Sequence, residues 1–468
     1  MRMREQPSPV PRPPSASPST VHRLPHRPLR ILFVTTYGFD PAFPSRPEQL
    51  QARALVARGH AVIAHEYLDR RYPGQSQRHE WLPGGLPVHR AATLGFFAPE
   101  ALLRLLLADR PDIIHLHHMR SLLGYQTVLA ARRLGIPTLL TVNGLLHDGD
   151  LVHDRERPLE APLRYDNLLT TPSLLLARLA RGAHPRRAVR NYLIHAPLLH
   201  VDHVLACSRA ERDLLTRIGV NPLRMSVLPH AVDLTAYDER RPTTDDQAAP
   251  PAARLSAIGY RLSASAARPM VLYIGQLVPR KGFDLLARAM PLVLRAVPEA
   301  RFVFVSHNRA GEDELRRIVA EGGVADRLEL PGRVSEAEKL RLLGEAAVLA
   351  APSRYEGFGI PLIEAMAAGA PVVTTDVMAC NEIIDHERNG LLTPYGDVEA
   401  LAAAIIRLLR DRPLATRLAA AGRPEAFTRY GAAKLAEDLE ALYLRLIEPI
   451  ADRRSPKADR RSPKADRR

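Results

Sequence analysis

The sequence predicts an α/β protein built from two doubly wound domains. Apolar runs of strand length alternate with helical segments in both halves of the chain, a pattern typical of parallel sheets covered by helices on both faces. The length of 468 residues exceeds one ordinary core, and a stretch rich in Ala, Pro, Arg and Ser separates the two patterned halves. We therefore expect an N-terminal domain over 29–235, a linker or insertion over 236–268 and a C-terminal domain over 269–433.

In the N-terminal half, strands and helices alternate until about residue 144 and again after residue 199. Helices are expected from about Glu48 to Arg58 and from Leu122 to Leu134, because a glycine ends each periodic run, and a third from Glu211 to Ile218. The segment between, 145–199, carries eight arginines among leucine clusters and gives no clear element. The predicted strands are Leu29–Thr36, a run that begins at Ala61, Asp112–His117, Ile136–Val142, Asp202–Ser208 and Arg224–Pro229.

The C-terminal half repeats the same alternation and predicts a second open sheet. Its strands are expected at Met270–Gly275, Arg301–Val305, Leu328–Gly332, Val348–Ala351 and Val372–Thr375. Its helices are expected near 284–297, 312–320, 362–368, 401–409 and 434–447.

The positive charge of the chain lies mainly at its ends. The formal net charge is +14, but residues 1–30 contribute +5 and residues 451–468 another +5, which leaves +4 for residues 31–450. A folded face that binds nucleic acid is therefore not expected. Residues 1–28 are crowded with proline and lack the apolar core of a secretory signal, so we expect a disordered leader. Residues 451–468 repeat a charged, proline-containing motif and are expected to form a disordered tail.

Cysteine usage and hydropathy favour a cytoplasmic protein. Cys207 and Cys380 form neither a disulfide framework nor a Cys-x-x-Cys motif, so a reducing compartment is expected. No run of roughly 18 uncharged apolar residues occurs. Two segments, Leu168–Leu179 and Ile194–Val201, combine leucines with nearby arginines. This composition is found in core helices whose arginines are solvated, and also in helix faces that lie on an anionic membrane. We favour core helices and keep peripheral contact with the inner face of the membrane as the alternative.

The segment 352–369 carries the most specific chemistry in the sequence. Apolar runs that read as buried strands flank it on both sides. Pro361 suits the first turn of a helix, and Gly369 is placed to end that helix. The unit is therefore a strand, a glycine loop, a short helix and a strand.

Such a loop predicts a phosphate site at the carboxyl edge of the sheet. Gly357 and Gly359 allow an anion to approach the backbone N–H groups at the positive end of the helix. Glu356 and Glu364 flank this position without needing to touch the anion, and carboxylates there suit sugar hydroxyls.

The Glu356-x7-Glu364 spacing within Ser353–Gly369 resembles the nucleotide-sugar signature of family-four retaining glycosyltransferases of the GT-B fold, the glycosyl transferases group 1. The resemblance covers about residues 29–448 and includes Asp112–His118, Gly275–Gly282 and Gly390–Leu392. It implies two Rossmann-like domains facing across a cleft, an acceptor side on the N-terminal domain and a nucleotide-sugar site on the C-terminal domain. It also implies that a last helix, over 434–450, packs back on the N-terminal domain.

The resemblance assigns roles to individual residues. Glu364 would bind ribose hydroxyls, Glu356 hexose hydroxyls and Lys281 the diphosphate, while the backbone near Val334 would hold the base. Attack of the acceptor on the same face as the leaving phosphate, which takes the acceptor's proton, would retain the anomeric configuration. The candidate catalytic residues are Glu356 and Asn143, and the candidate donor-binding residues are Gln276, Arg280, Lys281, Val334, Gly357, Phe358, Gly359 and Glu364.

The chain departs from the family pattern in four places. Gln276 stands where an arginine is usual, so Arg280 is the candidate for the missing charge. Ser45-Arg46-Pro47 replaces a Gly-Gly pair, and Met378-Ala379 replaces another before Glu382. Asn143 stands where a histidine is usual and keeps a hydrogen-bonding side chain near the donor sugar.

No metal or other cofactor is expected. His115, His117 and His118 have no carboxylate at ligand spacing, and adjacent strand positions point to opposite faces. Asp148-Gly149-Asp150 matches a short divalent-ion pattern that arises often in loops, and we interpret it as incidental. A Gly-x4-Gly-Lys-Ser/Thr phosphate loop is absent, which argues against an ATPase.

The expected function is transfer of a sugar from a nucleoside diphosphate donor to a glycan, lipid or small-molecule acceptor that the sequence does not identify. Two alternatives stay open. A nucleotide-sugar epimerase of the same fold would share the donor, and a non-catalytic sugar-nucleotide-binding protein is allowed by Gln276 and Asn143.

Overall fold

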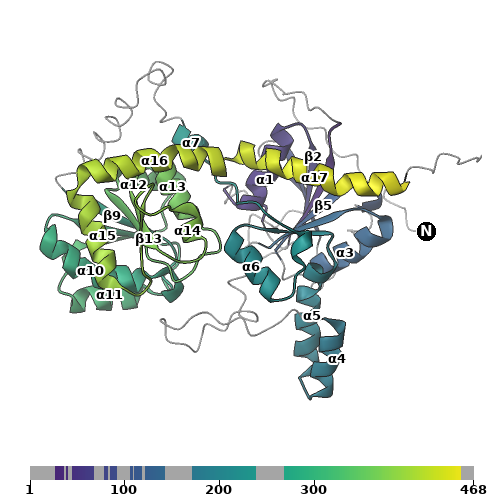
Figure 1. The fold of residues 1–468 in the computed structure, drawn as a ribbon, viewed down its shortest axis with the longest axis horizontal. Helices are drawn as coiled ribbons and strands as arrows, with labels where there is room; N and C mark the ends of the chain where they lie inside the picture. Colours follow the sequence, from purple (N-terminus) through teal and green to yellow (C-terminus); the bar gives the residue numbers. More distant parts are fainter. Residues whose placement is uncertain are drawn as a thin grey trace, which may run out of the picture.

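Two α/β lobes lie side by side in the computed structural model and are spanned along one side by a long helical segment (Figure 1). The structure describes residues 27–35, 38–40, 45–67, 79–82, 85–91, 106–108, 110–118, 122–142, 171–238 and 268–454. The predicted class, two parallel sheets with helices on their faces, is confirmed.

The first lobe contains an eight-stranded sheet in the order β3-β4-β2-β1-β5-β6-β7-β8, parallel except for the β3–β4 pair. Strands β5 and β6 are buried along their whole length, as expected for a parallel sheet covered on both faces. The strands are β1 (Arg30–Thr35), β2 (Ala61–Tyr67), β3 (His79–Leu82), β4 (Leu86–Ala91), β5 (Ile113–His117), β6 (Thr138–Thr141), β7 (His203–Ala206) and β8 (Met225–Val227). The helices are α1 (Pro47–Ala57), α3 (Leu122–Leu134), α4 (Pro172–Ala180), α5 (Pro185–His200), α6 (Arg209–Arg217) and α7 (Thr235–Asp238).

The second lobe contains a six-stranded parallel sheet in the order β11-β10-β9-β12-β13-β14. Helices α10 and α15 pack against one face, with Phe283, Leu286 and Ile405 fully buried in one core cluster. The strands are β9 (Met270–Ile274), β10 (Arg301–Val305), β11 (Leu328–Gly332), β12 (Val348–Ala351), β13 (Val372–Thr375) and β14 (Leu391–Thr393). The helices are α10 (Phe283–Ala296), α11 (Glu312–Glu321), α12 (Glu336–Glu345), α13 (Ile360–Ala368), α14 (Cys380–Ile383) and α15 (Val398–Arg410).

Two consecutive helices, α16 (Arg412–Tyr430) and α17 (Ala432–Arg454), run from the second lobe across the first. They are separated at Gly431, where the backbone leaves the helical conformation. The α17 residues Leu439 and Tyr443 are buried in the same core cluster as Phe33 of β1. The Tyr443 hydroxyl also lies 2.7 Å from His115 Nδ1, so α17 is anchored in the first lobe by apolar packing and a buried hydrogen bond.

The strands predicted from apolar runs all occur, whereas β3, β4, β14, α7, α12, α14 and α16 were not predicted. The β3–β4 pair was not predicted because both strands are short and the pair lies at the edge of the sheet, where Trp81 is 43% exposed. Its residues therefore lack the strong apolar pattern of a buried strand. Among the described residues, no helix is both long and apolar enough to cross a bilayer.

A buried ion pair fixes the connection that follows β1. The side chains of Glu66 in β2 and Arg90 in β4 are fully buried, and Arg90 Nε lies 2.6 Å from Glu66 Oε1. Glu66 Oε2 accepts hydrogen bonds of 3.1 Å from the N–H groups of Gly38 and Phe39. The pair therefore ties the start of the β1–α1 connection to two neighbouring strands.

We expect Arg90→Met to destabilise the protein by about 3–5 kcal/mol, because it leaves the Glu66 carboxylate buried without its cation. Urea denaturation followed by circular dichroism measures the loss. Arg316→Met is the matched control, since it breaks an exposed pair with Glu312 on α11 and should cost at most about 1 kcal/mol. Equal shifts for the two variants would contradict the role given to the buried pair.

Candidate functional site

The candidate site lies at the switch point of the second sheet. Strands β9 and β12 are neighbours, and the chain continues from them toward opposite edges of the sheet. The connections that follow their carboxyl ends, 275–282 and 352–359, meet in the crevice where ligands bind in open α/β sheets. Both segments singled out in the sequence are therefore brought together.

The glycine loop adopts the geometry that its sequence predicts. Gly359 has a φ of +100°, which an L side chain rarely adopts, and it is the N-cap of α13. Pro361 lies in the first turn, and Gly369 ends the helix with a φ of +77°. The free N–H groups and the positive end of α13 therefore face the carboxyl edge of the sheet.

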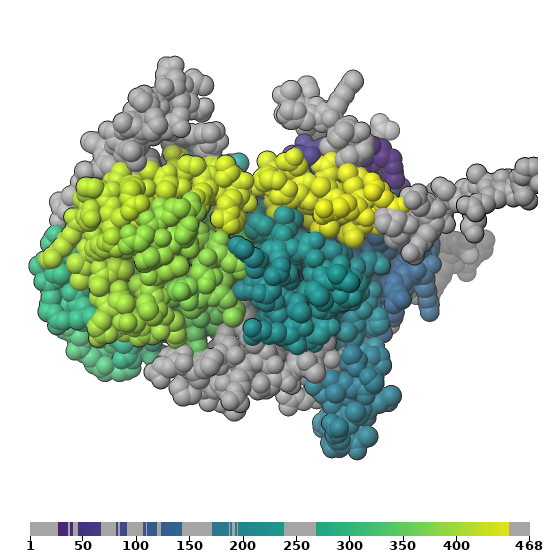
Figure 2. All heavy atoms as spheres, in the orientation of Figure 1, coloured from purple at the N-terminus to yellow at the C-terminus, as the bar shows by residue number. Residues whose placement is uncertain are grey.

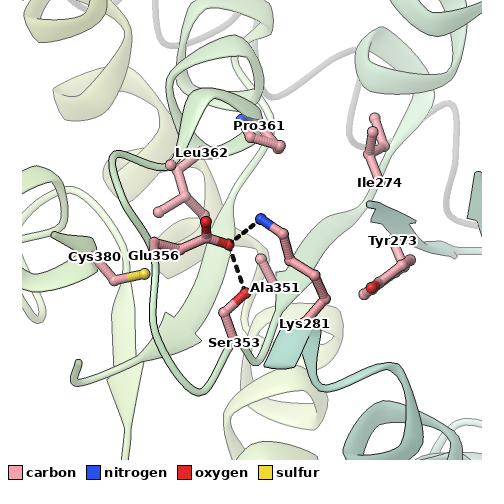
Figure 3. Close-up of a pocket in the computed structure, with 10 residues that line it drawn as sticks. Tyr273, Ile274, Lys281, Ala351, Ser353, Glu356, Pro361, Leu362 and Cys380 are labelled. Carbon is pink, nitrogen blue, oxygen red and sulfur yellow. Dashed lines mark hydrogen bonds and ion pairs between the residues drawn. The ribbon is translucent and has the colours of Figure 1, made fainter. Parts of the chain in front are cut away.

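Lys281 and Ser353 converge on the carboxylate of Glu356 (Figure 3). Lys281 Nζ lies 2.5 Å from Glu356 Oε1, and Ser353 Oγ lies 2.7 Å from the same oxygen. Burial alone would raise the pKa of Glu356, but the Lys281 charge and the two hydrogen bonds outweigh it and hold that pKa below its usual value. Glu356 is therefore a buried, ionised carboxylate with its cation in place.

Glu364 is held by a second cation. Its Oε1 lies 2.8 Å from Lys339 Nζ of α12, which also contacts the exposed Glu336 at 2.8 Å. Burial raises the pKa of Glu364, and the Lys339 charge offsets this only in part. The two glutamates of the Glu-x7-Glu pattern thus have separate lysine partners.

Gln276 and Arg280 contact each other, with Arg280 Nη2 3.2 Å from Gln276 Oε1. Gln276 Nε2 also lies 3.3 Å from His307 Nε2. Val334, just after β11, is partly buried against the core cluster that contains Phe358 and Leu362. Asn143, Asp148 and Asp150 lie outside the described residues.

A cleft of about 370 Å³ separates the glycine loop from the first lobe. The second lobe lines it with residues of both connections, and the first lobe lines it with residues from several separate elements. These residues are Lys281, Glu356, Gly357, Phe358, Gly359, Ile360 and Pro361 from the second lobe and Arg46, Pro47, Glu48, His118, Cys207 and His230 from the first.

The first-lobe wall contains a carboxylate–imidazole pair that the sequence analysis missed. His118 Nε2 lies 3.3 Å from Glu48 Oε1, and the Glu48 side chain is 4% exposed. Burial raises the pKa of Glu48, but the hydrogen bond and charge of His118 dominate with help from His117 and lower it to about 2. Burial lowers the pKa of His230 to about 4, and its ring packs edge to face on Phe358.

The histidines of β5 are engaged in packing and hydrogen bonds. His115 contacts Thr141 Oγ1 at 2.6 Å as well as Tyr443, and its ring lies 4.1 Å from that of His117. Within the described part of the chain, no group of three or more His, Cys, Asp or Glu side chains is arranged to hold a metal ion.

Two profiles of glycosyltransferase families match this chain, each over a different part of it. The profile described as "Glycosyl transferases group 1" matches residues 268–411, and the profile described as "Glycosyltransferase Family 4" matches residues 50–236. The two ranges fall on the second and the first lobe.

Individual relatives are similar over different shares of their length. A phosphatidyl-myo-inositol mannosyltransferase of Mycobacterium leprae is 37% identical over 175 residues, 37% of this chain and 46% of that protein. The chain thus spans about half the length of this relative and of other relatives at similar identity. A GDP-mannose-dependent monoacylated alpha-(1-6)-phosphatidylinositol monomannoside mannosyltransferase of Corynebacterium glutamicum is 26% identical over 73% of this chain and 89% of that protein.

Among solved structures, Anabaena Alr3699/HepE in complex with UDP superposes with a TM-score of 0.62 at 18% identity. The superposition covers 89% of this chain and all of that one. This likeness concerns the fold alone and confirms the expected GT-B architecture.

Gly282 lies where the two connections of the site meet, and we expect its replacement to lower the free energy of unfolding strongly. It has a φ of +68°, and a Cβ there would lie 1.9 Å from the Pro352 carbonyl oxygen. Gly282→Ala should therefore cost about 3 kcal/mol or more in urea denaturation. Gly323→Ala is the matched control, because Gly323 has a φ of +69° with open space around it and should lose only roughly 1–2 kcal/mol. Equal losses would mean that the contact with Pro352 is not a constraint.

Proposed function

Because the chain belongs to the group 1 glycosyltransferases, we propose that it transfers a hexose from a nucleoside diphosphate sugar to an acceptor that enters from the first lobe. The observation that carries this proposal is the convergence of Lys281 on Glu356 beside the glycine loop. A cation and oriented N–H groups suit a diphosphate, and carboxylates suit sugar hydroxyls. The names of a GDP-mannose-dependent relative and of a structural neighbour with UDP support a nucleotide-sugar donor.

We propose one position for each part of the donor. The diphosphate lies against Lys281 and the N–H groups at the start of α13, with Gln276 and Arg280 on its other side. Glu364, whose Oε1 already accepts from Lys339, binds the ribose with its remaining acceptor sites. Glu356 contacts the hexose, and the backbone near Val334 contacts the base.

We propose that the transfer retains the anomeric configuration. The bond between the anomeric carbon and the phosphate oxygen breaks while the acceptor oxygen bonds to the same face of that carbon. The acceptor's proton passes to an oxygen of the leaving phosphate. Lys281 and the loop N–H groups stabilise the charge that builds on the diphosphate, and the ionised Glu356 stabilises positive charge at the sugar. This step uses no metal and no cofactor.

We propose that the acceptor is carried by a membrane lipid. Relatives named for transfer to phosphatidylinositol lipids support this, and so does the hairpin formed by α4 and α5. The hairpin projects from the first lobe beyond the rest of that lobe, as Figure 2 shows in teal at the lower right. The expectation of a core helix is wrong for α4, because no side chain of α4, which the structure describes in full, is buried, and Leu176 is 67% exposed.

The charge of the hairpin fits an anionic bilayer. Residues 171–200 contain five arginines and no aspartate or glutamate. Exposed leucine beside arginine allows apolar contact with the acyl region and electrostatic contact with lipid headgroups. The hairpin would hold the first lobe at the membrane surface, where a lipid-linked acceptor is available.

Incubation with radiolabelled GDP-mannose or UDP-glucose, with and without a lipid or glycan extract, tests the function. Transfer of label to the extract supports the proposal. Conversion of the donor into a different sugar nucleotide would favour an epimerase. Donor binding without any turnover would favour a non-catalytic binding protein.

Separate replacement of the two glutamates of the Glu-x7-Glu pattern should give two different kinetic defects. Glu364→Gln should chiefly raise the donor KM, by about 10-fold, because contacts to ribose are alike in the ground and transition states. Glu356→Gln should lower kcat, by roughly 100-fold or more, because its charge acts on the developing positive charge. Glu336→Gln is the control, since this exposed glutamate shares Lys339 with Glu364. Wild-type kinetics for both central variants would refute the assignment.

The membrane contact is tested by sedimentation with phosphatidylcholine vesicles that contain or lack phosphatidylglycerol. The variant Leu176→Ser, Arg178→Glu, Arg181→Glu should bind anionic vesicles at least about 10-fold more weakly than the wild type. The matched control is Leu223→Ser, Arg217→Glu, Arg295→Glu, which changes exposed residues outside the hairpin and keeps both basic termini. Equal loss in the two variants, or equal binding to neutral vesicles, would contradict the proposed contact.

A further inference from the structure

We infer that His230 and Tyr430 are positioning residues, which hold the glycine loop in place through the side chain of Phe358. The inference rests on the proposed function, in which the N–H groups of this loop bind the diphosphate. It assigns a role to two rings that lie where the chain passes between the lobes. Neither ring needs to contact the donor for this role.

The part of the glycine loop next to α13 carries one side chain, that of Phe358. In the sequence Gly357-Phe358-Gly359 both neighbours of the phenylalanine lack a Cβ, and Gly359 adopts a φ of +100°. Glycine loses more conformational freedom on folding than any other residue, so ordering this stretch has a high entropic cost. Contacts of the Phe358 ring are therefore a direct way to fix the peptide groups on either side of it.

Two other aromatic rings pack against Phe358, and all three rings are buried. The ring centroids of Phe358 and His230 lie 5.2 Å apart, with an angle of 82° between the ring planes. Those of Phe358 and Tyr430 lie 5.8 Å apart at 71°. Both arrangements are edge to face, which is favourable because the positive edge of one ring meets the negative face of the other.

The two rings come from the two places where the chain passes between the lobes. His230 lies just before Val232 and Leu234, which are already buried in a core cluster of the second lobe. Tyr430 ends α16, and Gly431 separates it from α17 on the first lobe. The Val232 N–H donates to the Tyr430 carbonyl at 3.0 Å, and Val232 forms a parallel bridge with Gly431. The phenylalanine of the loop therefore packs against both passages, which are also tied to each other.

Open space adjoins the Phe358 ring in two places. Phe358 lines the cleft of about 370 Å³ together with His230, and it lines a smaller cavity of about 130 Å³ together with Tyr430. A ring that lost either aromatic partner would have room to reorient. Such a movement would displace the neighbouring N–H groups from the position that suits a diphosphate.

Calorimetric titration of the full chain with GDP and UDP tests the inference. His230→Ala and Tyr430→Leu should each raise the Kd for the diphosphate by about 2- to 10-fold, the range expected for the loss of one aromatic pair. His230→Phe and Tyr430→Phe keep a ring at each position and should recover most of the affinity. His230 lines the cleft, so its variant keeps the test informative if Tyr430→Leu does not fold.

A double-mutant cycle tests whether His230 acts through Phe358. Phe358→Leu keeps an apolar side chain but removes the ring, so His230→Ala should raise the Kd by less than about 2-fold in this background. Fully additive losses would overturn the positioning role. Tyr125→Leu is the control and should leave the Kd unchanged, because it breaks an edge-to-face pair with Tyr192 and does not line the cleft.

Ligands without phosphate separate positioning of the loop from a general loss of structure. Guanosine and uridine have a base and a ribose but no group for the loop N–H groups to bind. Their binding, followed by saturation-transfer NMR, should be the same for the variants and the wild type. An equal loss of affinity for nucleoside and diphosphate would overturn the inference, since a merely structural role predicts that result.

The outcomes separate this inference from the proposed function. Loss of diphosphate affinity alone, recovered by the phenylalanine variants, supports it. If the diphosphates bind the wild type and the variants alike, the inference is wrong and the proposed donor site stands. If neither diphosphate binds the wild type, the proposed function fails and the inference fails with it.

Discussion

The site depends on the close approach of two backbone segments at Gly282. The Pro352 carbonyl occupies the space where any other residue would carry its Cβ, and the Arg354 N–H bonds the Arg280 carbonyl at 2.8 Å. These contacts fix the connection after β9 against the connection after β12. Lys281, one residue before the glycine, is thereby brought to Glu356, so an electrostatic pair in the cleft follows from a steric constraint beneath it.

The same loop is also contacted by the first lobe. Burial raises the pKa of the Cys207 thiol well above its usual value, so the group stays protonated and donates to the Gly357 carbonyl at 3.0 Å. The carboxylate of Glu382 accepts hydrogen bonds of 2.8 Å from the N–H groups of Arg209 and Ala210 at the start of α6. The width of the cleft is therefore set by polar contacts between the lobes as well as by α16 and α17.

Local sequence was sufficient for the parts of the site that are contiguous in the chain. The glycine loop, the start of α13 near Pro361 and the end of α13 at Gly369 follow from residue type and spacing alone. Glu48, His118 and His230 could not be recognised in this way, because they come from three separate segments and meet only when the first sheet forms. Glu48 reads as an ordinary acidic residue in a first helical turn, and only the enclosure by Gly38 and the partner His118 distinguishes it. The edge strand β3 and its neighbour β4 were missed because their pattern is weak, not because it is contradictory.

The replacement of the Gly-Gly pair by Met378-Ala379 has a structural consequence at the junction of the lobes. Ala379 adopts a φ of +68° and a ψ of −39°, a conformation that glycine would adopt without strain. Ala379 is the N-cap of α14, and α14 carries Glu382 to the start of α6. Because each charge-assisted hydrogen bond at a helix N-terminus contributes about 1.5–3 kcal/mol, the two bonds of Glu382 are sufficient to offset the strain at Ala379. The contact between the lobes and the backbone conformation of Ala379 are therefore energetically linked, because separation of the lobes would remove the two hydrogen bonds of Glu382 that offset the strain at Ala379.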